Sequence, residues 1–175
     1  MRSALGAVSI LLAATVLVAP APTATSVSVG PTDRVDAARG AGVKQQVIDL
    51  TNAERDKRGC SALRANASLG EAAQKHSKKM ANYSDDHGWR EALQHQLPGE
   101  AGLGTRITRA GYRNWTLVGE NIASGYPTAE AVVRGWMASQ GHRRNILNCR
   151  FKHIGIGLAY DNDNLPFWTQ DFGRR

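Results

Sequence analysis

Long apolar segments, cysteines and aromatic side chains are all scarce in this chain of 175 residues. Aromatic residues make up 6% of the chain, and there are two cysteines. Outside the extreme N-terminus no apolar run is long enough to cross a bilayer, which excludes a multi-span membrane protein. Collagen-like and coiled-coil chains are excluded by the absence of a repeat. The remaining composition, 42% apolar and 21% charged, is that of one ordinary globular domain.

Acidic residues are outnumbered, with 15 Asp and Glu against 22 Lys and Arg, so the formal net charge is +7. This excess favours acidic partners such as anionic cell-wall polymers, lipid head groups or nucleic acid. Nucleic acid is the least favoured of these, because the basic residues are dispersed and no zinc-finger or RNP spacing occurs. We therefore expect no nucleic-acid partner.

The N-terminus has the pattern of an export signal. Arg2 precedes an apolar stretch over residues 4–19, and small residues follow. This predicts a signal peptide over residues 1–26, although cleavage anywhere between Ala19 and Gly30 fits the pattern. A retained membrane anchor is the alternative, but the stretch is at the short limit for a span and is rich in Ala. We expect a secreted protein with no stable membrane insertion after cleavage, and a flexible leader over residues 27–42.

The two cysteines, Cys60 and Cys149, do not form a CxxC pair of the redox or zinc-binding type. In an oxidising compartment an even number of widely spaced cysteines indicates one disulfide. Two unpaired buried thiols are the alternative, which export makes less favourable.

The apolar spacing predicts helices early in the chain and strands late in it. Ser68 and Thr128 are placed to cap two of the helices. This order indicates an α+β fold over residues 43–173, with helices packed on a mostly antiparallel sheet. We expect helices over residues 43–58, 69–81, 105–110, 129–138 and 141–147, and strands over 117–123, 154–160 and 167–172. Residues 82–104 are predicted to form a long loop with a turn of helix at 90–93.

Four motifs occur in a characteristic order. Gly119–Ala123 reads GENIA, Gly135–Arg143 reads GWMASQGHR, Asn145–Leu147 reads NIL and Trp168–Gly173 reads WTQDFG. Together they resemble the CAP superfamily of cysteine-rich secretory, antigen 5 and pathogenesis-related 1 proteins, whose domain is also called SCP. The resemblance covers nearly all of residues 43–173. It implies a three-layer α-β-α sandwich with a central groove lined by two His and two Glu.

Three of these four groove residues match the family's motifs directly, namely Glu120, Glu130 and His142. The fourth, a histidine, depends on how the loop before the Arg-Ile motif is counted. Counting back from that motif reaches His95, whereas counting forward from the second helix comes closer to His87. We choose His95, with His87 as its substitute, because insertions in a loop shift the forward count most easily.

The resemblance implies chemistry for this set. Two imidazoles and two carboxylates suit a divalent metal such as Zn²⁺, and Ser139 and Gln170 are expected beside the groove. We expect a secreted, monomeric binding protein rather than an enzyme, with an extracellular lipid, glycan or protein as its ligand. One alternative is a metal-dependent hydrolase acting on peptides or cell-wall material, with Glu120 or His142 as general base. Another is a lipid- or sterol-binding cleft that does not use the four residues.

Taken without the family, the same residues have plainer interpretations. Glu120 in an apolar strand would be a buried carboxylate paired with an arginine or a backbone donor. Glu130 would be a helix-dipole residue. His142 would belong to a solvated basic turn, or would contact an anion at the start of a short helix. His76, on the apolar stripe of the second helix, is predicted to be a hydrogen-bonded core histidine.

Overall fold

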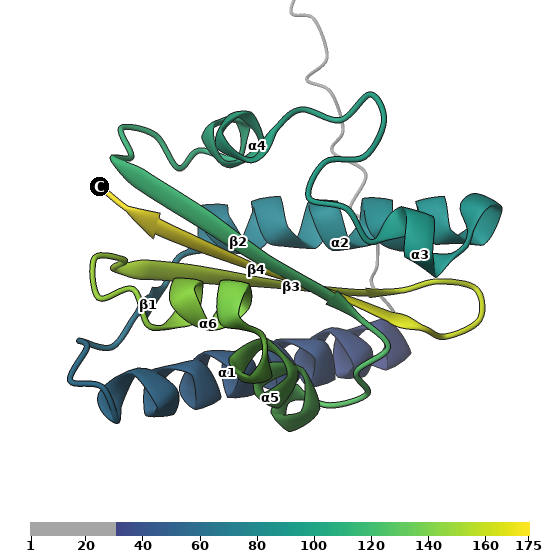
Figure 1. The fold of residues 1–175 in the computed structure, drawn as a ribbon. Helices are drawn as coiled ribbons and strands as arrows, with labels where there is room; N and C mark the ends of the chain where they lie inside the picture. Colours follow the sequence, from purple (N-terminus) through teal and green to yellow (C-terminus); the bar gives the residue numbers. More distant parts are fainter. Residues whose placement is uncertain (1–30) are drawn as a thin grey trace, which may run out of the picture.

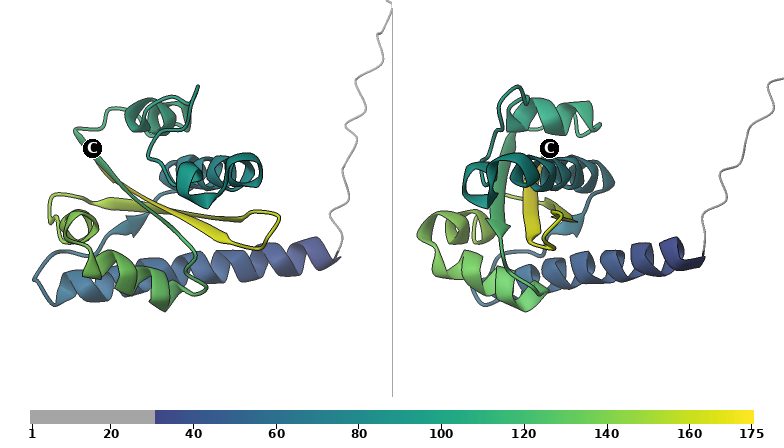
Figure 2. Two further views of the ribbon diagram at one scale, coloured as in Figure 1. Left: turned by 45° about the vertical axis from the view of Figure 1, so that its right-hand side comes forward. Right: turned by 90° about the vertical axis from the view of Figure 1, so that its right-hand side faces the viewer.

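A computed structural model describes the backbone of residues 31–175 and the side chains from Gly40 onward. The predicted signal peptide lies outside the described residues. A central sheet is covered on one face by α2, α3 and α4 and on the other by α1, α5 and α6 (Figures 1 and 2). The predicted α-β-α sandwich is therefore confirmed.

The sheet has four strands in the order β1-β3-β4-β2, and only β1 and β3 run parallel. β3 and β4 form the predicted hairpin, and β4 is buried along almost its whole length. Because β4 lies between β2 and β3, it carries the motif Trp168–Gly173 into the centre of the molecule. The strands are β1 (Arg64–Ala65), β2 (Leu117–Ser124), β3 (His153–Tyr160) and β4 (Pro166–Arg174).

The first helix, α1, spans Pro31–Asp56 and starts well before the predicted position at Val43. It extends back through residues 31–42, which the sequence predicts as a flexible leader. Apolar periodicity identifies only the part of a helix that packs against something. That part begins near Val43, which packs against the main core together with Val47 and Leu50.

The second helix, α2 (Ala67–His87), differs from its prediction at both ends. Its N-cap is Asn66, whose side chain accepts a hydrogen bond from the Leu69 N–H, so the predicted Ser68 cap is wrong. The helix continues to His87 and stops where Gly88 takes a φ of 84°. The sequence prediction missed residues 82–87 because most of their side chains are polar.

The remaining helices are short and follow the prediction closely. Thr128 caps α5 as expected, by accepting a hydrogen bond from the Ala131 N–H. Among the described residues, no helix is long and apolar enough to span a membrane. These helices are α3 (Trp89–Ala92), α4 (Leu103–Arg109), α5 (Ala129–Ala138) and α6 (Gln140–Ile146).

The predicted disulfide is present between Cys60 and Cys149. It joins the segment after α1 to the segment after α6. Next to it the buried Arg55 side chain donates hydrogen bonds to the carbonyls of Ile146 and Asn148, which hold the same two segments together.

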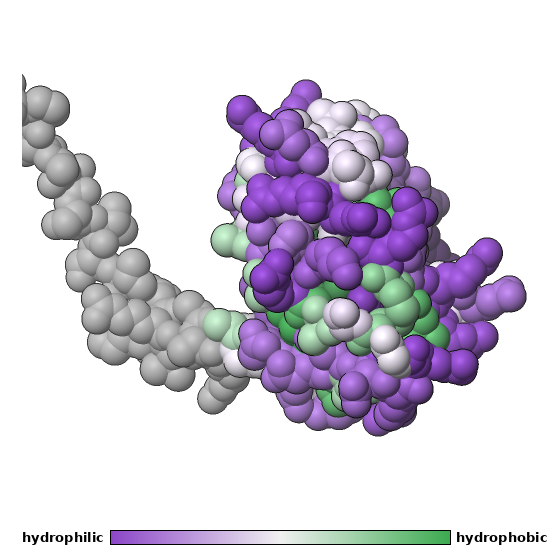
Figure 3. All heavy atoms as spheres, turned by 90° about the vertical axis from the view of Figure 1, so that its left-hand side faces the viewer, coloured by the Kyte–Doolittle hydropathy of each residue, from purple (hydrophilic) through white to green (hydrophobic). Residues whose placement is uncertain are grey.

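Hydrophilic side chains cover most of the face at the left of Figure 1, and apolar side chains gather in the lower half of that face (Figure 3).

Candidate functional site

The centre of the candidate site is Glu120, which β2 places beside the sheet with its side chain 2% exposed. His95 Nδ1 lies 2.8 Å from Glu120 Oε1. The Arg106 guanidinium contacts the other carboxylate oxygen and also donates to the His95 carbonyl at 2.7 Å. Arg106 thus binds both the carboxylate and the backbone of the histidine that faces it.

The loop between α3 and α4 brings His95 to this position. Ala92 and Leu97 flank His95 in the chain, and both are buried. They pack with Met80, Ile122 and Phe167 in one apolar cluster. Burial of the loop's apolar side chains therefore holds His95 over β2, although the loop contains little regular structure.

A second carboxylate, Glu100, lies next to the first. His76 Nδ1 is 3.0 Å from Glu100 Oε2, and His76 Nε2 is 3.1 Å from the Gln94 carbonyl and 4.0 Å from Glu120 Oε2. Lys79 and Arg106 each approach Glu100 to 3.5 Å. Because His76 is fully buried between these groups, it is a core histidine, as predicted. Burial lowers its pKa, and the charges of Glu120 and Glu100 oppose that shift.

A third carboxylate, Asp171, lies opposite Glu120 in the β2–β4 register. It is fully buried, and neither of its oxygens has a hydrogen-bond partner among the described atoms. Burial and the negative charge of Glu120 raise the pKa of Asp171 well above its usual range. These surroundings therefore favour the neutral form of Asp171.

Glu120 behaves in the opposite way. Burial alone would raise its pKa, but the hydrogen bond from His95 and the electrostatic interactions with His76 and Arg106 lower it below the usual value. Glu120 is therefore ionised, as the plainer interpretation of a buried carboxylate paired with an arginine predicts.

A chain of amides crosses the sheet beside these carboxylates. The Gln170 amide donates to Thr51 Oγ1 at 2.9 Å, and its oxygen accepts from Asn121 at 3.0 Å. Asn121 also donates to the His142 carbonyl at 3.2 Å. Asn145 completes the set by donating to Asn121 Oδ1 and to the Glu120 carbonyl. Gln170 thus supports the backbone of His142 from within the core.

His142 borders an open hollow of about 380 Å³ between β2, α3 and α5. Ser139 lines the same hollow, as do the partly exposed rings of Trp89 and Tyr126. Burial, followed by the positive charge of His95, lowers the pKa of His142. We call this hollow the aromatic groove. Its lining residues are Trp89, Leu93, Ile122, Ala123, Ser124, Gly125, Tyr126, Gly135, Trp136, Ser139 and His142.

Two of the predicted site residues lie elsewhere. Glu130 is in the first turn of α5, where its carboxylate accepts a hydrogen bond from Gln46 of α1. It faces a hollow between α1 and α5, in the other helical layer. His87 is exposed at the end of α2 and stacks on Tyr83. Of the two alternative histidines, His95 is the one that meets Glu120.

This arrangement does not fit a metal site. In the part of the chain that the structure describes, no three His, Cys, Asp or Glu side chains are placed to hold a metal ion. Glu120 already contacts His95 and Arg106, and Glu130 contacts α1. An arginine on the central carboxylate competes with a cation for the same oxygen.

Sequence reasoning missed two residues of the charged cluster, Arg106 and Glu100, and it missed the contact of His76 with carboxylates. Arg106 is part of the recognisable Arg-Ile motif, so a signal was available for it. Glu100 lies in an irregular loop and gives no signal.

Comparison with known proteins places the chain in a family. The model of the CAP family, described as the cysteine-rich secretory protein family, matches residues 48–172. YkwD of Bacillus subtilis (strain 168), named as an uncharacterized protein, is 38% identical over 131 residues. YlbC of the same organism, named as an uncharacterized membrane protein, is 32% identical over 134 residues. These alignments cover 74% and 75% of this chain, but only 46% and 34% of YkwD and YlbC.

Solved structures agree with this assignment. An extracellular protein with an SCP domain from Bacillus anthracis str. Ames has a TM-score of 0.68 and 31% identity, covering 86% of this chain and 45% of its own. An outer surface protein from Borrelia burgdorferi, at 23% identity, shares the fold with a TM-score of 0.59, covering 75% of this chain and 91% of its own. The chain thus spans less than half of its curated relatives, and from residue 48 to residue 172 it belongs to the CAP family of cysteine-rich secretory proteins.

Proposed function

We propose that this CAP domain is an extracellular binding protein that holds a glycan in the aromatic groove. The observation that carries the proposal is the pairing of two partly exposed aromatic rings with polar side chains in one open hollow. Trp89 is 46% exposed and Tyr126 36% exposed, and both line the groove together with Ser139 and His142.

Such a lining matches the two kinds of surface that a sugar ring presents, the apolar C–H face and the polar hydroxyl edge. The C–H groups of a pyranose ring pack on the face of an aromatic side chain, which offers a large apolar area with little loss of conformational entropy. The hydroxyls at the ring edge need hydrogen-bond donors and acceptors. Because its pKa is lowered, His142 is a neutral imidazole at neutral pH, which offers one of each.

A lipid fits this groove less well. An acyl chain is bound most favourably where its whole surface is removed from water. The aromatic groove is open to solvent and contains polar groups, so much of the surface of a bound acyl chain would remain exposed to water. The excess of basic residues, with a net charge of +7, further favours an anionic cell-wall polymer as the source of the glycan.

The geometry does not favour the alternative of a metal-dependent hydrolase. That reaction would need Glu120 free to act on a metal-bound water, whereas Arg106 and His95 occupy its two oxygens. Export is supported by the apolar N-terminus and by the likeness to a Bacillus anthracis protein described as extracellular.

Tryptophan fluorescence tests the proposal, since Trp89 lies in the groove. A soluble tetramer of β-1,4-linked N-acetylglucosamine should cause a saturable change in emission. Trp89→Ala should weaken the binding at least about tenfold. Trp115→Ala is the matched control, because Trp115 is also partly exposed but lies beside α4, where it donates to Thr108.

Two results would overturn the proposal. The first is the absence of any saturable change in the wild type. The second is equal binding by wild type and Trp89→Ala, measured by calorimetry so that loss of the fluorophore does not matter. Saturable uptake of a fluorescent fatty acid, lost in Trp89→Ala, would instead assign the groove to lipid.

A further inference from the structure

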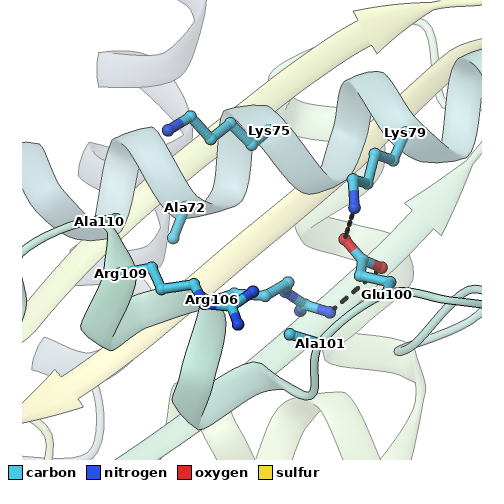
Figure 4. A pocket seen from close by; sticks show the side chains of 8 residues that line it. All are labelled: Ala72, Lys75, Lys79, Glu100, Ala101, Arg106, Arg109 and Ala110. Atoms are coloured by element: carbon cyan, nitrogen blue, oxygen red, sulfur yellow. Dashed lines mark ion pairs between the residues drawn. The ribbon is translucent and has the colours of Figure 1, made fainter.

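A second hollow, of about 190 Å³, lies between α2 and α4 and is lined by side chains of both helices and of the loop before α4 (Figure 4). Small side chains leave this space open, because Ala72, Ala101 and Ala110 form part of its wall. We call it the basic pocket. Its lining residues are Ala72, Lys75, Lys79, Glu100, Ala101, Arg106, Arg109 and Ala110.

Positive charge dominates the lining. Four of its side chains are cationic, Lys75 and Lys79 from α2 and Arg106 and Arg109 from α4, against the single carboxylate of Glu100. Lys75 also pairs with Glu71 at 2.5 Å, outside the lining. Arg106 also contacts the ionised Glu120, so the four cations face three carboxylates and keep an excess of one positive charge, which an anion would balance.

The two arginines differ in how much of their hydrogen-bonding capacity is open to the pocket. The Arg106 side chain is 8% exposed, and its nitrogens contact the His95 carbonyl, Glu100 and Glu120. Its Nε is buried and does not face the pocket, so Arg106 contributes mainly its charge. Arg109, on the same helix, makes no ion pair with any residue in the described part of the chain, and its side chain lines the pocket.

Glu100 organises these cations without neutralising them all. Lys79 and Arg106 approach its carboxylate from opposite sides, each at 3.5 Å (Figure 4). The Glu100 side chain is itself 3% exposed, and His76 Nδ1 lies 3.0 Å from its Oε2. The ammonium and the guanidinium are therefore already positioned, which reduces the entropy lost when a ligand binds.

We propose that the basic pocket binds a phosphoryl group, either as free phosphate or as a small phosphomonoester. A phosphoryl group has at least three terminal oxygens, so it can contact more of the four cations at once than the two oxygens of a carboxylate can. Its oxygens also accept the charge-assisted hydrogen bonds that arginine and lysine donate. The proposal rests on α2, α4 and the loop before α4, and it does not depend on glycan binding in the aromatic groove.

Titration of the ¹⁵N-labelled protein with inorganic phosphate tests the proposal, with ionic strength held constant by sodium chloride. Amide shifts in α2 and α4 near Lys75, Lys79 and Arg109 should saturate along one binding curve. Glycerol 3-phosphate should give the same pattern, which separates a monoester ligand from free phosphate by their relative affinities. Acetate should bind about tenfold more weakly.

Arg109→Gln removes one exposed charge at the pocket and should weaken phosphate binding about tenfold. Arg134→Gln is the matched control, because Arg134 is also exposed but lies on α5, in the opposite helical layer. Its affinity for phosphate should equal that of the wild type. The proposal is overturned if phosphate shifts do not saturate, if acetate binds equally well, or if the two variants lose affinity to the same extent.

Discussion

Glu120 and Asp171 face each other across two strands, and their surroundings shift their pKa values in opposite directions. Glu120 has a histidine and an arginine on its two oxygens, so it keeps its charge in a buried place. Asp171 has no ion pair with any described residue, and burial together with the negative charge of Glu120 raises its pKa. The two carboxyl groups thus differ in pKa because the residues around them differ.

Neutral amides at the two positions should have unequal effects on stability. Asp171→Asn replaces a carboxyl group whose neutral form its surroundings favour by a neutral group of the same shape, and should change the free energy of unfolding by less than about 1 kcal/mol. Glu120→Gln removes the carboxylate that Arg106 contacts and should destabilise the protein by about 2 to 3 kcal/mol. Urea unfolding at neutral pH measures both. An equal loss in the two variants would mean that Asp171 is ionised.

His76 should make the stability of the protein sensitive to mild acid. Its folded pKa is lowered from 6.5, chiefly by burial, so below that pH the unfolded chain binds more protons than the folded one. The contribution of His76 is therefore fully present above pH 6.5 and is lost as the pH falls below it. The loss has a slope of up to about 1.4 kcal/mol per pH unit.

Urea unfolding across the range below pH 6.5 measures this slope in the wild type and in His76→Gln. The variant should lose less stability on acidification than the wild type. His142 and His153 also have lowered pKa values, so some acid sensitivity should remain. Parallel curves for the two proteins would contradict a role for His76.

At the scale of elements, the contact between α2 and β3 depends on glycine. A Cβ at Gly155 would lie 2.2 Å from the Gly70 backbone nitrogen, and a Cβ at Gly157 would lie 2.2 Å from the Ala73 carbonyl oxygen. The helix backbone therefore rests directly on the strand, where no side chain fits. This close approach brings His76, on α2, within reach of the carboxylates.

Gly155→Ala should destabilise the protein by about 3 kcal/mol, because α2 must move away from β3. Gly70→Ala is the control from the same contact. Its Cβ would meet nothing within 4 Å, and alanine in a helix interior should gain up to about 1 kcal/mol. Thermal unfolding followed by circular dichroism compares the two. Similar melting temperatures would mean that the layers have room to separate.

Elements could be predicted from the sequence to the extent that they bury apolar side chains. The hairpin of β3 and β4 and the helix α5 follow their patterns, and the Thr128 cap is confirmed. The early part of α1 and the last turn of α2 present polar or small residues, so periodicity gave no sign of them. The N-cap of α2 is Asn66 rather than Ser68. Both residue types cap helices well, so the local sequence does not decide between them.

At the scale of the whole molecule, the candidate site is a product of topology. His95 and Glu120 are brought together by a buried loop, and only the family resemblance pointed to the pair. The same resemblance pointed to Glu130, which the fold places against Gln46 of α1. The charged network of His76, Glu100 and Arg106 needs three-dimensional proximity that no single motif encodes. The motifs thus predicted some residues of the site, whereas the packing of the chain determines which of these side chains come into contact.

The disulfide is the one covalent link between distant parts of the described chain. Cys60 and Cys149 are 89 residues apart, so the bridge removes much of the conformational freedom of the unfolded state. In the chain-entropy account a loop of this length contributes about 4 to 5 kcal/mol. The folded state holds the same segments by a second means, because Arg55 donates to the carbonyls of Ile146 and Asn148.

Replacing both cysteines, as Cys60→Ser with Cys149→Ser, should therefore lower the free energy of unfolding by about 4 to 5 kcal/mol and leave the native arrangement intact. Urea unfolding gives the first quantity, and the ¹⁵N spectrum of α2 and α4 reports the second. The reduced wild type is the control and should match the double variant. A loss below about 1 kcal/mol would contradict the chain-entropy account, in which the bridge stabilises the fold by restricting the unfolded chain. Shifts in α2 and α4 would mean that the bridge, rather than Arg55 and the packed layers, holds the molecule in shape.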